Sequence, residues 1–323
     1  MRIGLTFDLR SEHVARGFSE DETAEFDKDE TIAGIAGALE RLGFSVDRIG
    51  NVRALLCRLA GGERWDIVFN IAEGVGGFGR EAQVPALLEA YDIPFTFSDS
   101  LVCGLTLHKA MTKRVLRDAG LPTADFAVVA CADDVRSVNL AFPVFAKPVA
   151  EGSSKGIEQR SHAVDRDALE SICAALLQRF AQPVLVETYL PGREFTVGIL
   201  GSGAAAECLG VMEIGVPGAG IYSLAHKRCD NAIAYRLASD QVARDAGTIA
   251  LAAWRLVGGR DAARIDLRCD RAGRPHILEI NALPGLEPGR SDLVYCAERA
   301  GLSYDDLIRK IVSSALDRYG LAR

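Results

Sequence analysis

Two neighbouring segments decide the fold of this chain: Arg264-Ile265-Asp266-Leu267-Arg268 and Ile277-Leu278-Glu279-Ile280-Asn281-Ala282-Leu283-Pro284-Gly285. In both segments polar and apolar residues alternate with a period of two, which predicts two β-strands. Between them, Asp270-Arg271-Ala272-Gly273-Arg274-Pro275 has the composition of a turn. We therefore expect the two strands to pair as an antiparallel hairpin.

Four polar side chains of this expected hairpin share one face. Alternation places Arg264 and Asp266 on one face of the first strand. It likewise places Glu279 and Asn281 on one face of the second strand. Carboxylate and amide oxygens are ligands for a hard cation such as Mg²⁺, which usually also bridges substrate phosphates. Each strand alone fits the solvated face of an exposed hairpin better, but the two together favour a metal site.

Length and composition indicate a soluble globular protein of two or three domains. The chain has 323 residues, of which 49% are hydrophobic and 25% charged. Its net charge of −7 argues against general nucleic-acid binding, and no apolar run approaches the roughly 18 residues of a membrane span. The eight cysteines form no C-x-x-C pair, which favours reduced thiols. Since the start of the chain also lacks a signal-peptide pattern, we expect a cytoplasmic protein.

Three regions follow one another along the chain and predict an α/β fold that becomes α+β in its last two thirds. Residues 1–100 alternate strand and helix patterns, which predicts a doubly wound N-terminal domain. Residues 101–188 predict a central subdomain, in which one helix runs over 105–118 to a Gly-Leu-Pro stop signal. Residues 189–323 predict a C-terminal subdomain that contains the hairpin. The long acidic stretch 8–29 indicates a functional or a mobile loop.

A strand pattern that ends at Lys147 leads into a glycine- and serine-rich loop. In Glu151-Gly152-Ser153-Ser154-Lys155-Gly156, backbone amides and hydroxyls can close over anionic oxygens. An ordinary flexible turn explains the loop alone equally well. However, Lys147 lies in an otherwise apolar strand, and a buried lysine needs an anionic partner such as phosphate. Because the Walker pattern G-x-x-x-x-G-K-[ST] is absent, the segment predicts a phosphate site of another kind.

A second hairpin pattern carries two glutamates. An apolar strand delivers Glu187, a Pro-Gly turn reverses the chain, and Glu194 begins the next strand. A carboxylate can accept hydrogen bonds from two ribose hydroxyls, and backbone amides near Tyr189 and Leu190 can read an adenine edge. Alone, this pattern fits a hairpin with surface glutamates. A weaker feature is Lys227, in a basic cluster that can face either phosphates or water.

In this order and spacing, these elements resemble an ATP-grasp ligase, and the match is closest to the D-alanine–D-alanine ligase group. The resemblance covers most of the chain, over residues 99–113, 142–156, 184–197, 222–227 and 264–291. It implies an ATP-grasp fold that follows an N-terminal doubly wound domain. It also implies an ATP-dependent ligase that joins a carboxylate to an amine.

The resemblance assigns expected roles to individual residues. Residues 187–190 are expected to contact adenine, and Glu194 the ribose. The full set of expected nucleotide contacts is Lys109, Lys147, Glu151, Ser153, Ser154, Glu187, Tyr189, Leu190, Glu194 and Lys227. The expected ligands of two Mg²⁺ ions, or of Mn²⁺ in their place, are Asp266, Glu279 and Asn281. The expected catalytic groups are Ser153, Lys227, Arg264 and Gly285. Among them, Arg264 and the Gly285 amide are expected to stabilise the oxyanion of the tetrahedral intermediate.

The implied reaction follows from the chemistry of carboxylates. A carboxylate is a poor electrophile, because its negative charge repels a nucleophile and oxide is a poor leaving group. Phosphorylation by ATP makes an acyl phosphate, from which an amine displaces phosphate to form an amide. Lysines, an arginine and Mg²⁺ are expected because charge builds on the transferring phosphoryl group. A closing loop is also needed, since an acyl phosphate in open water hydrolyses.

The chain departs from the D-alanine ligases where that family binds amino acids. The glutamate with which the family binds the amino group of the first D-alanine has no exact match here, and residues 70–74 replace the family's His-Gly motif. Arg228 stands in place of a tyrosine of the family, and Arg290 is an added residue near the substrate serine. The expected substrate contacts are Glu12, His13, Arg228, Arg290 and Ser291. An added arginine can pair with a carboxylate in a bidentate fork, although a surface position fits Arg228 nearly as well. We therefore expect an acyl substrate other than D-alanine, larger or more acidic.

Three functions stay open at this point. The leading one is an ATP-dependent ligase that joins a small-molecule acid to an amine, giving a dipeptide or an amino-acid conjugate. The alternatives are a D-alanine–D-alanine ligase of peptidoglycan synthesis and an ATP-binding regulatory protein without catalysis, against which the retained polar residues speak. We expect neither a nucleic acid nor a membrane as partner. A homodimer is a candidate assembly, because relatives are often dimers through their N-terminal region.

Overall fold

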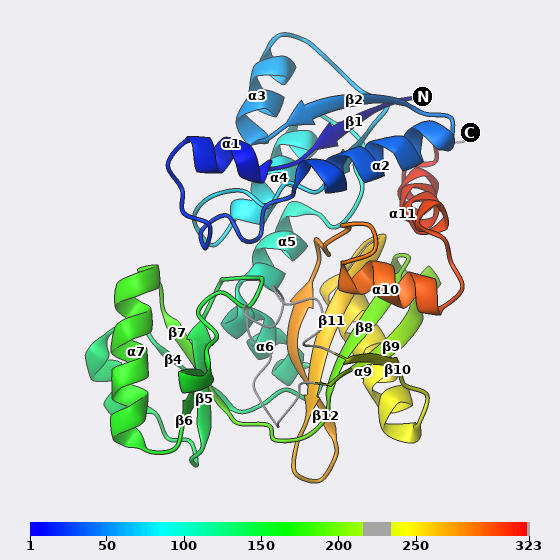
Figure 1. Ribbon diagram of the computed structural model, residues 1–323. Helices are drawn as coiled ribbons and strands as arrows, with labels where there is room; N and C mark the ends of the chain where they lie inside the picture. Colours follow the sequence, from blue (N-terminus) through cyan, green and yellow to red (C-terminus); the bar gives the residue numbers. More distant parts are fainter. Residues whose placement is uncertain (216–233, 322–323) are drawn as a thin grey trace.

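The computed structural model describes residues 1–215 and 234–321 of the chain. Three β-sheets organise these residues (Figure 1): a three-stranded sheet in the order β2-β1-β3, a four-stranded sheet in the order β4-β7-β5-β6, and a five-stranded sheet in the order β10-β9-β8-β11-β12. The first sheet is parallel, and the other two are antiparallel. This confirms the predicted change from α/β to α+β along the chain.

The parallel sheet carries helices on both faces. Its strands are β1 (Arg2–Thr6), β2 (Ser45–Gly50) and β3 (Ile67–Asn70), and its helices are α2 (Asp29–Arg41), α3 (Val52–Ala60) and α4 (Gln83–Ala90). Ile3 and Leu5 are fully buried in one core with α2, while Val68 lies in a second core with α3 and α4. The alternating residues of these strands thus contact opposite layers, as in a doubly wound domain.

The acidic stretch 8–29 is partly ordered by its own contacts. It contains the short helix α1 (Arg10–Ala15), and a bridge between Leu9 and Asp27 closes its two ends. Asp8 accepts a hydrogen bond of 2.8 Å from the Gly74 amide after β3. The stretch therefore lies beside the carboxyl ends of the parallel strands, where doubly wound folds bind ligands.

The central part differs from the prediction at one helix. The helix expected over 105–118 is two helices, α5 (Ser100–Leu107) and α6 (Lys109–Asp118). The break is at His108, whose ψ of 87° leaves the helical region and whose side chain caps α6 by accepting from the Met111 amide. The change in direction places Lys109 in the first turn of α6, with its amide bonded to the carbonyl of Val149 at 3.0 Å.

Helix α7 (Arg166–Phe180) covers one face of the four-stranded sheet. Its strands are β4 (Phe126–Val129), β5 (Val144–Pro148), β6 (His162–Ala163) and β7 (Val184–Thr188). Apolar residues of β5 and β7 pack against α7 in a core of their own. Within residues 1–215 and 234–321, the 3₁₀ turns are η1 (Arg80–Ala82), η2 (Ala132–Ser137), η3 (Gln159–Ser161) and η4 (Gly203–Ala205).

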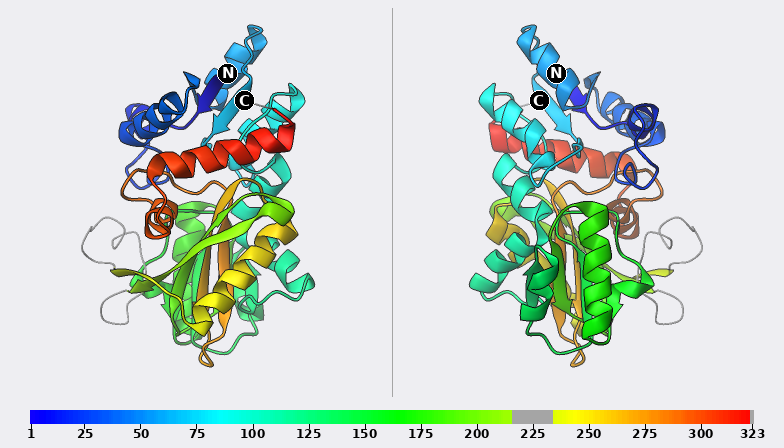
Figure 2. Two further views of the ribbon diagram at one scale, coloured as in Figure 1. Left: turned by 90° about the vertical axis from the view of Figure 1, so that its right-hand side faces the viewer. Right: turned by 90° about the vertical axis from the view of Figure 1, so that its left-hand side faces the viewer.

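The five-stranded sheet is covered by α9 (Gln241–Val257) on one face, where Trp254 is fully buried. Its strands are β8 (Glu194–Leu200), β9 (Glu207–Gly215), β10 (Ala234–Leu237), β11 (Ala262–Cys269) and β12 (Pro275–Asn281). Two helices follow the hairpin, α10 (Asp292–Arg299) and α11 (Tyr304–Tyr319). The views in Figure 2 show α11 running across the N-terminal layer.

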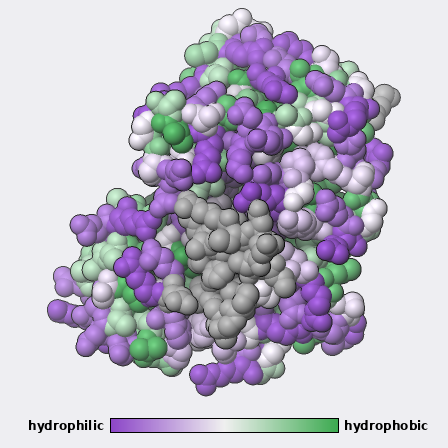
Figure 3. Space-filling view, in the orientation of Figure 1, coloured by the Kyte–Doolittle hydropathy of each residue, from purple (hydrophilic) through white to green (hydrophobic). Residues whose placement is uncertain are grey.

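Each sheet lies within one of the three predicted regions, but helices connect them. α11 packs on α2, and its residues Leu307 and Ile311 share a core with Ile32 and Ile35. The limits 1–100, 101–188 and 189–323 therefore stay a prediction. Hydrophilic residues dominate the face drawn in Figure 3. Among the described residues, none of the helices has the length and apolar character needed to cross a bilayer.

Candidate active site

The hairpin of β11 and β12 brings polar side chains to one face, as the alternation predicts. The strands pair antiparallel, with Asp266 directly opposite Glu279. Two positions along, Arg264 lies opposite Asn281. Opposed carboxylates repel each other unless cations balance them, and here Arg264 bonds to Asp266 while Lys109 Nζ lies 3.3 Å from Glu279 Oε2. The hairpin thus gathers negative charge beside positive groups.

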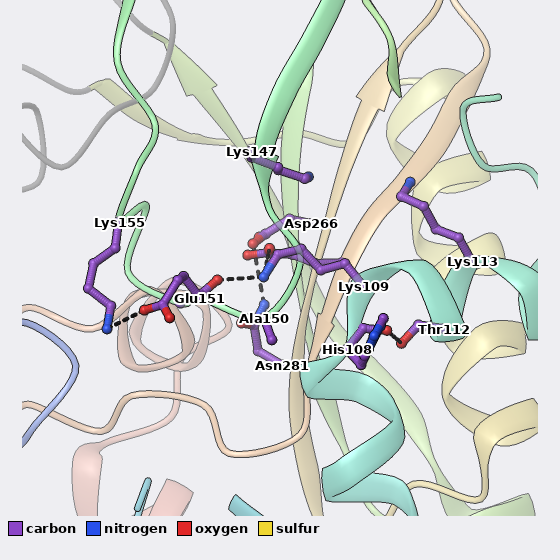
Figure 4. A network of polar contacts seen from close by, with 12 residues as sticks. His108, Lys109, Thr112, Lys113, Lys147, Ala150, Glu151, Lys155, Asp266 and Asn281 are labelled. Carbon is purple, nitrogen blue, oxygen red and sulfur yellow. Dashed lines mark hydrogen bonds and ion pairs between the residues drawn. The ribbon is translucent and has the colours of Figure 1, made fainter. Parts of the chain in front are cut away.

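The oxygens of Asp266, Glu279 and Asn281 suit a hard divalent cation. Asn281 Nδ2 donates to Asp266 Oδ2 at 3.3 Å, and Figure 4 shows the two side chains side by side. Over residues 1–215 and 234–321, no group of three or more His, Cys, Asp and Glu side chains is arranged to hold a metal. A cation here would take two carboxylates and an amide oxygen from the protein, which leaves positions for phosphate oxygens and water.

A buried ion-pair bridge lies beside this hairpin. Glu187 Oε1 is 2.5 Å from Lys113 Nζ, and its Oε2 is 2.8 Å from Lys147 Nζ. Burial alone would raise the pKa of Glu187, but the two lysines outweigh it and hold the pKa below its ordinary value. Lys113 also donates to the hydroxyl of Thr123 at 2.6 Å. Sequence reasoning missed Lys113, although it lies one helical turn after Lys109 on the same helix.

A cleft between the two antiparallel sheets is lined by six of the ten predicted nucleotide contacts. Its lining includes Lys147, Ser154, Glu187, Tyr189, Leu190 and Glu194, and it reaches the carboxylates of the hairpin. Glu194 is 3.3 Å from the guanidinium of Arg268, and this guanidinium lies over the Tyr189 ring, 5.4 Å from its centroid. Sequence reasoning also missed Arg268. The lysine suits the phosphates of a nucleotide, and the carboxylates suit its ribose hydroxyls or a bound cation. The aromatic and apolar end of the cleft suits its base.

The glycine- and serine-rich loop lies between this cleft and a second cavity. Ser154 lines the cleft, whereas Ser153 lines the cavity. The carbonyl of Glu151 accepts from Lys109 Nζ at 2.5 Å, and its carboxylate is 2.5 Å from Lys155 Nζ (Figure 4). Both serines have a positive φ, 48° and 58°, which is uncommon for residues other than glycine. Contacts with several segments hold the loop in this conformation.

The second cavity, of about 110 Å³, contains the predicted oxyanion groups. Its lining includes Lys109, Ser153, Arg264, Asn281 and Gly285, together with Glu25, Glu73 and Glu81. Glu73 and Glu81 share a hydrogen bond. Burial, reinforced by neighbouring carboxylates, raises the pKa of Glu73 well above its ordinary value and that of Glu81 to about 7. Three glutamates thus face the groups expected to act on the acyl carbon.

Comparison with known proteins identifies the family. The model of the D-ala D-ala ligase C-terminus matches residues 115–313. The D-alanine–D-alanine ligase of Sinorhizobium fredii is 32% identical over 322 residues, which cover 95% of this chain and 99% of that protein. The chain belongs to the D-alanine–D-alanine ligase family. The Bordetella pertussis D-alanine–D-alanine ligase is 38% identical over 245 residues, 74% of this chain and 76% of that one.

Family membership makes the chain an ATP-dependent carboxylate–amine ligase of the D-alanine–D-alanine ligase type, as the motifs predict. An uncharacterised protein of Sinorhizobium fredii, y4sG, is 37% identical over 268 residues, 78% of this chain and 75% of that one. The crystal structure of the Bacillus anthracis D-alanine–D-alanine ligase complexed with ATP superposes with a TM-score of 0.75 over 99% of both chains, at 20% identity. This likeness confirms the ATP-grasp fold.

The structure places the two substrate contacts expected from the acidic stretch of this ligase, Glu12 and His13, away from the second cavity. Glu12 is exposed on α1. His13 is buried, with its Nε2 3.0 Å from Asp8 Oδ1 and its ring packed on Phe26. Neither residue lines the cavity, whereas Glu25 does. Sequence reasoning missed Glu25 because periodicity cannot rank the glutamates of an irregular segment.

The remaining expected contacts of this ligase lie outside the cavity lining or outside the described residues. Ser291 Oγ accepts from the Glu287 amide at 2.8 Å, and exposed Arg290 is 3.9 Å from the Glu287 carboxylate. Neither residue lines the cavity. Lys227 and Arg228 fall in 216–233, outside the described residues, so their roles stay predictions. Sequence reasoning missed Glu73 and Glu81, although Glu73 lies in the segment 70–74 that replaces the family's His-Gly motif.

Proposed function

We propose that this ligase joins the carboxylate of one D-alanine to the amino group of a second, through an acyl phosphate formed from ATP. Relatives that carry the name D-alanine–D-alanine ligase support this choice. The observation that carries it is the chemistry of the second cavity, where Glu73 and Glu81 lie beside Arg264 and Gly285. Carboxylates at this position suit the ammonium group of an amino acid.

The same observation argues against the acyl substrate expected from the sequence. A larger or more acidic acid would bring a second negative charge toward three glutamates, of which Glu25 pairs with Arg80 at 2.9 Å. Like charges at short range repel each other. The expectation rested on Arg290, which is exposed and pairs with Glu287, and on Arg228. We therefore replace it with a substrate that carries an ammonium group.

In the proposed first step, a carboxylate oxygen of D-alanine attacks the γ-phosphorus of ATP, the bond from this phosphorus to the bridging oxygen of the β-phosphate breaks, and ADP leaves. Lys147 of the cleft and Lys109 of the second cavity would hold the phosphate oxygens, since both the cleft and the cavity reach Glu279 of the hairpin. Asp266, Glu279 and Asn281 would hold Mg²⁺, which when bound neutralises charge on the transferring phosphoryl group. Lys227 stays a predicted contact of that group.

In the second step, the amine of the other D-alanine attacks the acyl carbon and displaces phosphate. The Arg264 guanidinium and the Gly285 amide would stabilise the oxyanion of the tetrahedral intermediate. Ser153, from the loop above the same cavity, would help to position the acyl donor. Glu73 and Glu81 would hold the ammonium group of a substrate, so that the carboxylate faces the nucleotide.

A direct assay tests the proposal. Purified protein with ATP, Mg²⁺ and D-alanine should release ADP, and mass spectrometry should find D-alanyl-D-alanine. L-alanine and propionate are the controls, because propionate has the carboxylate but no ammonium group. Turnover of an acidic acid in preference to D-alanine would overturn the proposal. A cytoplasmic location and a homodimer stay predictions; fractionation of cells and light scattering of the pure protein test them.

A further inference from the structure

Three segments far apart in the sequence meet at one ion pair behind the second cavity. Glu25 comes from the acidic stretch, Arg80 from the turn before α4, and Ala150 and Gly152 from the glycine- and serine-rich loop. Arg80 Nη1 donates to the Ala150 carbonyl at 2.7 Å, and its Nη2 donates to Glu25 Oε2 at 2.9 Å. The other oxygen of Glu25 accepts from the Gly152 amide. One arginine and one glutamate thus connect the N-terminal domain to the loop.

This connection is buried and closely fitted. The Arg80 and Glu25 side chains are 7% and 4% exposed. A Cβ on Gly152 would lie 2.8 Å from the Glu25 carboxylate, so a side chain there would force the two apart. A Cβ on Gly74 would lie 2.5 Å from the Arg80 carbonyl, and its positive φ of 71° also favours glycine. Both glycines permit the close approach that the connection needs.

Because Arg80 and Glu25 are charged and buried, removing either one of them is energetically costly. Burial would raise the pKa of Glu25, but Arg80 and Lys155 outweigh it and hold the pKa below its ordinary value. Lys155, in the same loop, lies 3.4 Å from Glu25 Oε1. Removing one partner of a buried pair leaves the other charge uncompensated, which costs more than losing an exposed pair. These charges therefore favour the loop conformation in which Arg80 and Glu25 contact the loop.

We propose that Arg80 and Glu25 form a clasp that holds the loop closed over the acyl phosphate, so that the amine and not water reaches the acyl carbon. They are positioning residues, because they act on the loop and not on the reacting atoms. This inference rests on the proposed function for its chemical consequence. Its structural part, the hold on the loop, stands on the contacts alone.

The consequence concerns the fate of the intermediate. When water attacks the acyl phosphate, the bond between the acyl carbon and the phosphate oxygen breaks, phosphate leaves, and the carboxylate is formed again. ATP is then consumed without an amide bond. A ligase with a working clasp should form close to one dipeptide per ADP, and a ligase without it should form fewer.

Three variants test the clasp. Arg80→Met removes the guanidinium, Arg80→Lys keeps the charge but loses the fork that reaches two acceptors, and Glu25→Gln keeps an acceptor for Gly152 but loses the charge. The control is Arg41→Met, which breaks an exposed bidentate pair with Asp305, 2.7 Å for each bond, between α2 and α11. Thermal unfolding of each variant shows whether it is folded.

Two readouts are measured on each variant. Hydrogen exchange of a peptide that covers residues 150–156 should speed up about tenfold or more in Arg80→Met, less in the other two, and not in the control. The ratio of ADP to dipeptide should rise in the same order. Unchanged exchange in a folded Arg80→Met variant would overturn the clasp. A changed exchange rate with an unchanged product ratio would overturn its role in excluding water. If no acid–amine pair releases ADP from the wild type, the proposed function fails, while the exchange result still decides the clasp.

Discussion

Asp266 and Glu279 lie directly opposite each other on β11 and β12, and each carboxylate has a cation beside it. Asp266→Asn or Glu279→Gln should lower the rate of ADP release roughly a thousandfold or more, because several kcal/mol of charge stabilisation depend on the bound metal. Thermal unfolding should change little, since each substitution also relieves the repulsion between the two carboxylates. Rates near those of the wild type would remove the metal assignment.

The lysine bridge should matter for stability as well as for nucleotide binding. Lys113→Met should lower the free energy of unfolding by about 2–4 kcal/mol, because Glu187 stays buried with one cation fewer. Urea denaturation measures this change. Lys310→Met is the matched control, since Lys310 is an exposed lysine 3.5 Å from Glu207, and exposed pairs contribute about 0–1 kcal/mol. Equal effects of the two substitutions would contradict the structural role of Lys113.

The glutamate pair of the second cavity should set the affinity for the amino acid. Glu73→Gln and Glu81→Gln should each raise the KM for D-alanine about tenfold to a hundredfold, because a hydrogen bond to a charged group contributes about 1.5–3 kcal/mol. The KM for ATP should stay the same, since neither side chain lines the nucleotide cleft. Glu12→Gln, at an exposed glutamate of the same domain, is the control. A rise in the KM for ATP of equal size would point to a general structural effect.

Stability should depend on pH through Glu81. Burial raises the pKa of this carboxyl from 4.5 to about 7 in the folded chain, so the unfolded chain loses the proton at lower pH. The contribution of Glu81 to stability is therefore present below pH 4.5 and is lost as the pH rises toward 7. Glu81→Gln should show a smaller loss of unfolding free energy between pH 5 and pH 8 than the wild type. Identical pH dependence would show that another group is responsible.

The parts of the site that lie on regular strands were predictable from the sequence. Period-two alternation fixes which residues share a face, and a turn between two strands fixes their pairing, so the relation of Asp266 to Glu279 could be predicted. The buried charge of Lys147 beside Glu187 was predictable for a similar reason, as a charge in an apolar strand. Arg268 belongs to the same alternation, but nothing in the pattern gives its partner, Glu194, on another strand.

The parts that depend on irregular segments and on packing were not predictable. The acidic stretch offers many carboxylates, and only its path over the sheet turns Glu25 inward and leaves Glu12 exposed. The helix break at His108 depends on a side-chain cap that competes with helix continuation. Whether an arginine such as Arg290 faces a substrate or a neighbouring glutamate depends on a few ångströms of loop position.

The packing of α11 on α2 has a consequence for how the chain folds. The core of the N-terminal domain is shared between residues near the start of the chain, such as Ile3 and Ile35, and residues of α11, such as Ile308 and Ile311. Contacts between such distant residues form late, because a long intervening chain has to be ordered first. During synthesis part of the apolar surface of α2 therefore stays exposed until α11, which is made much later, packs against it.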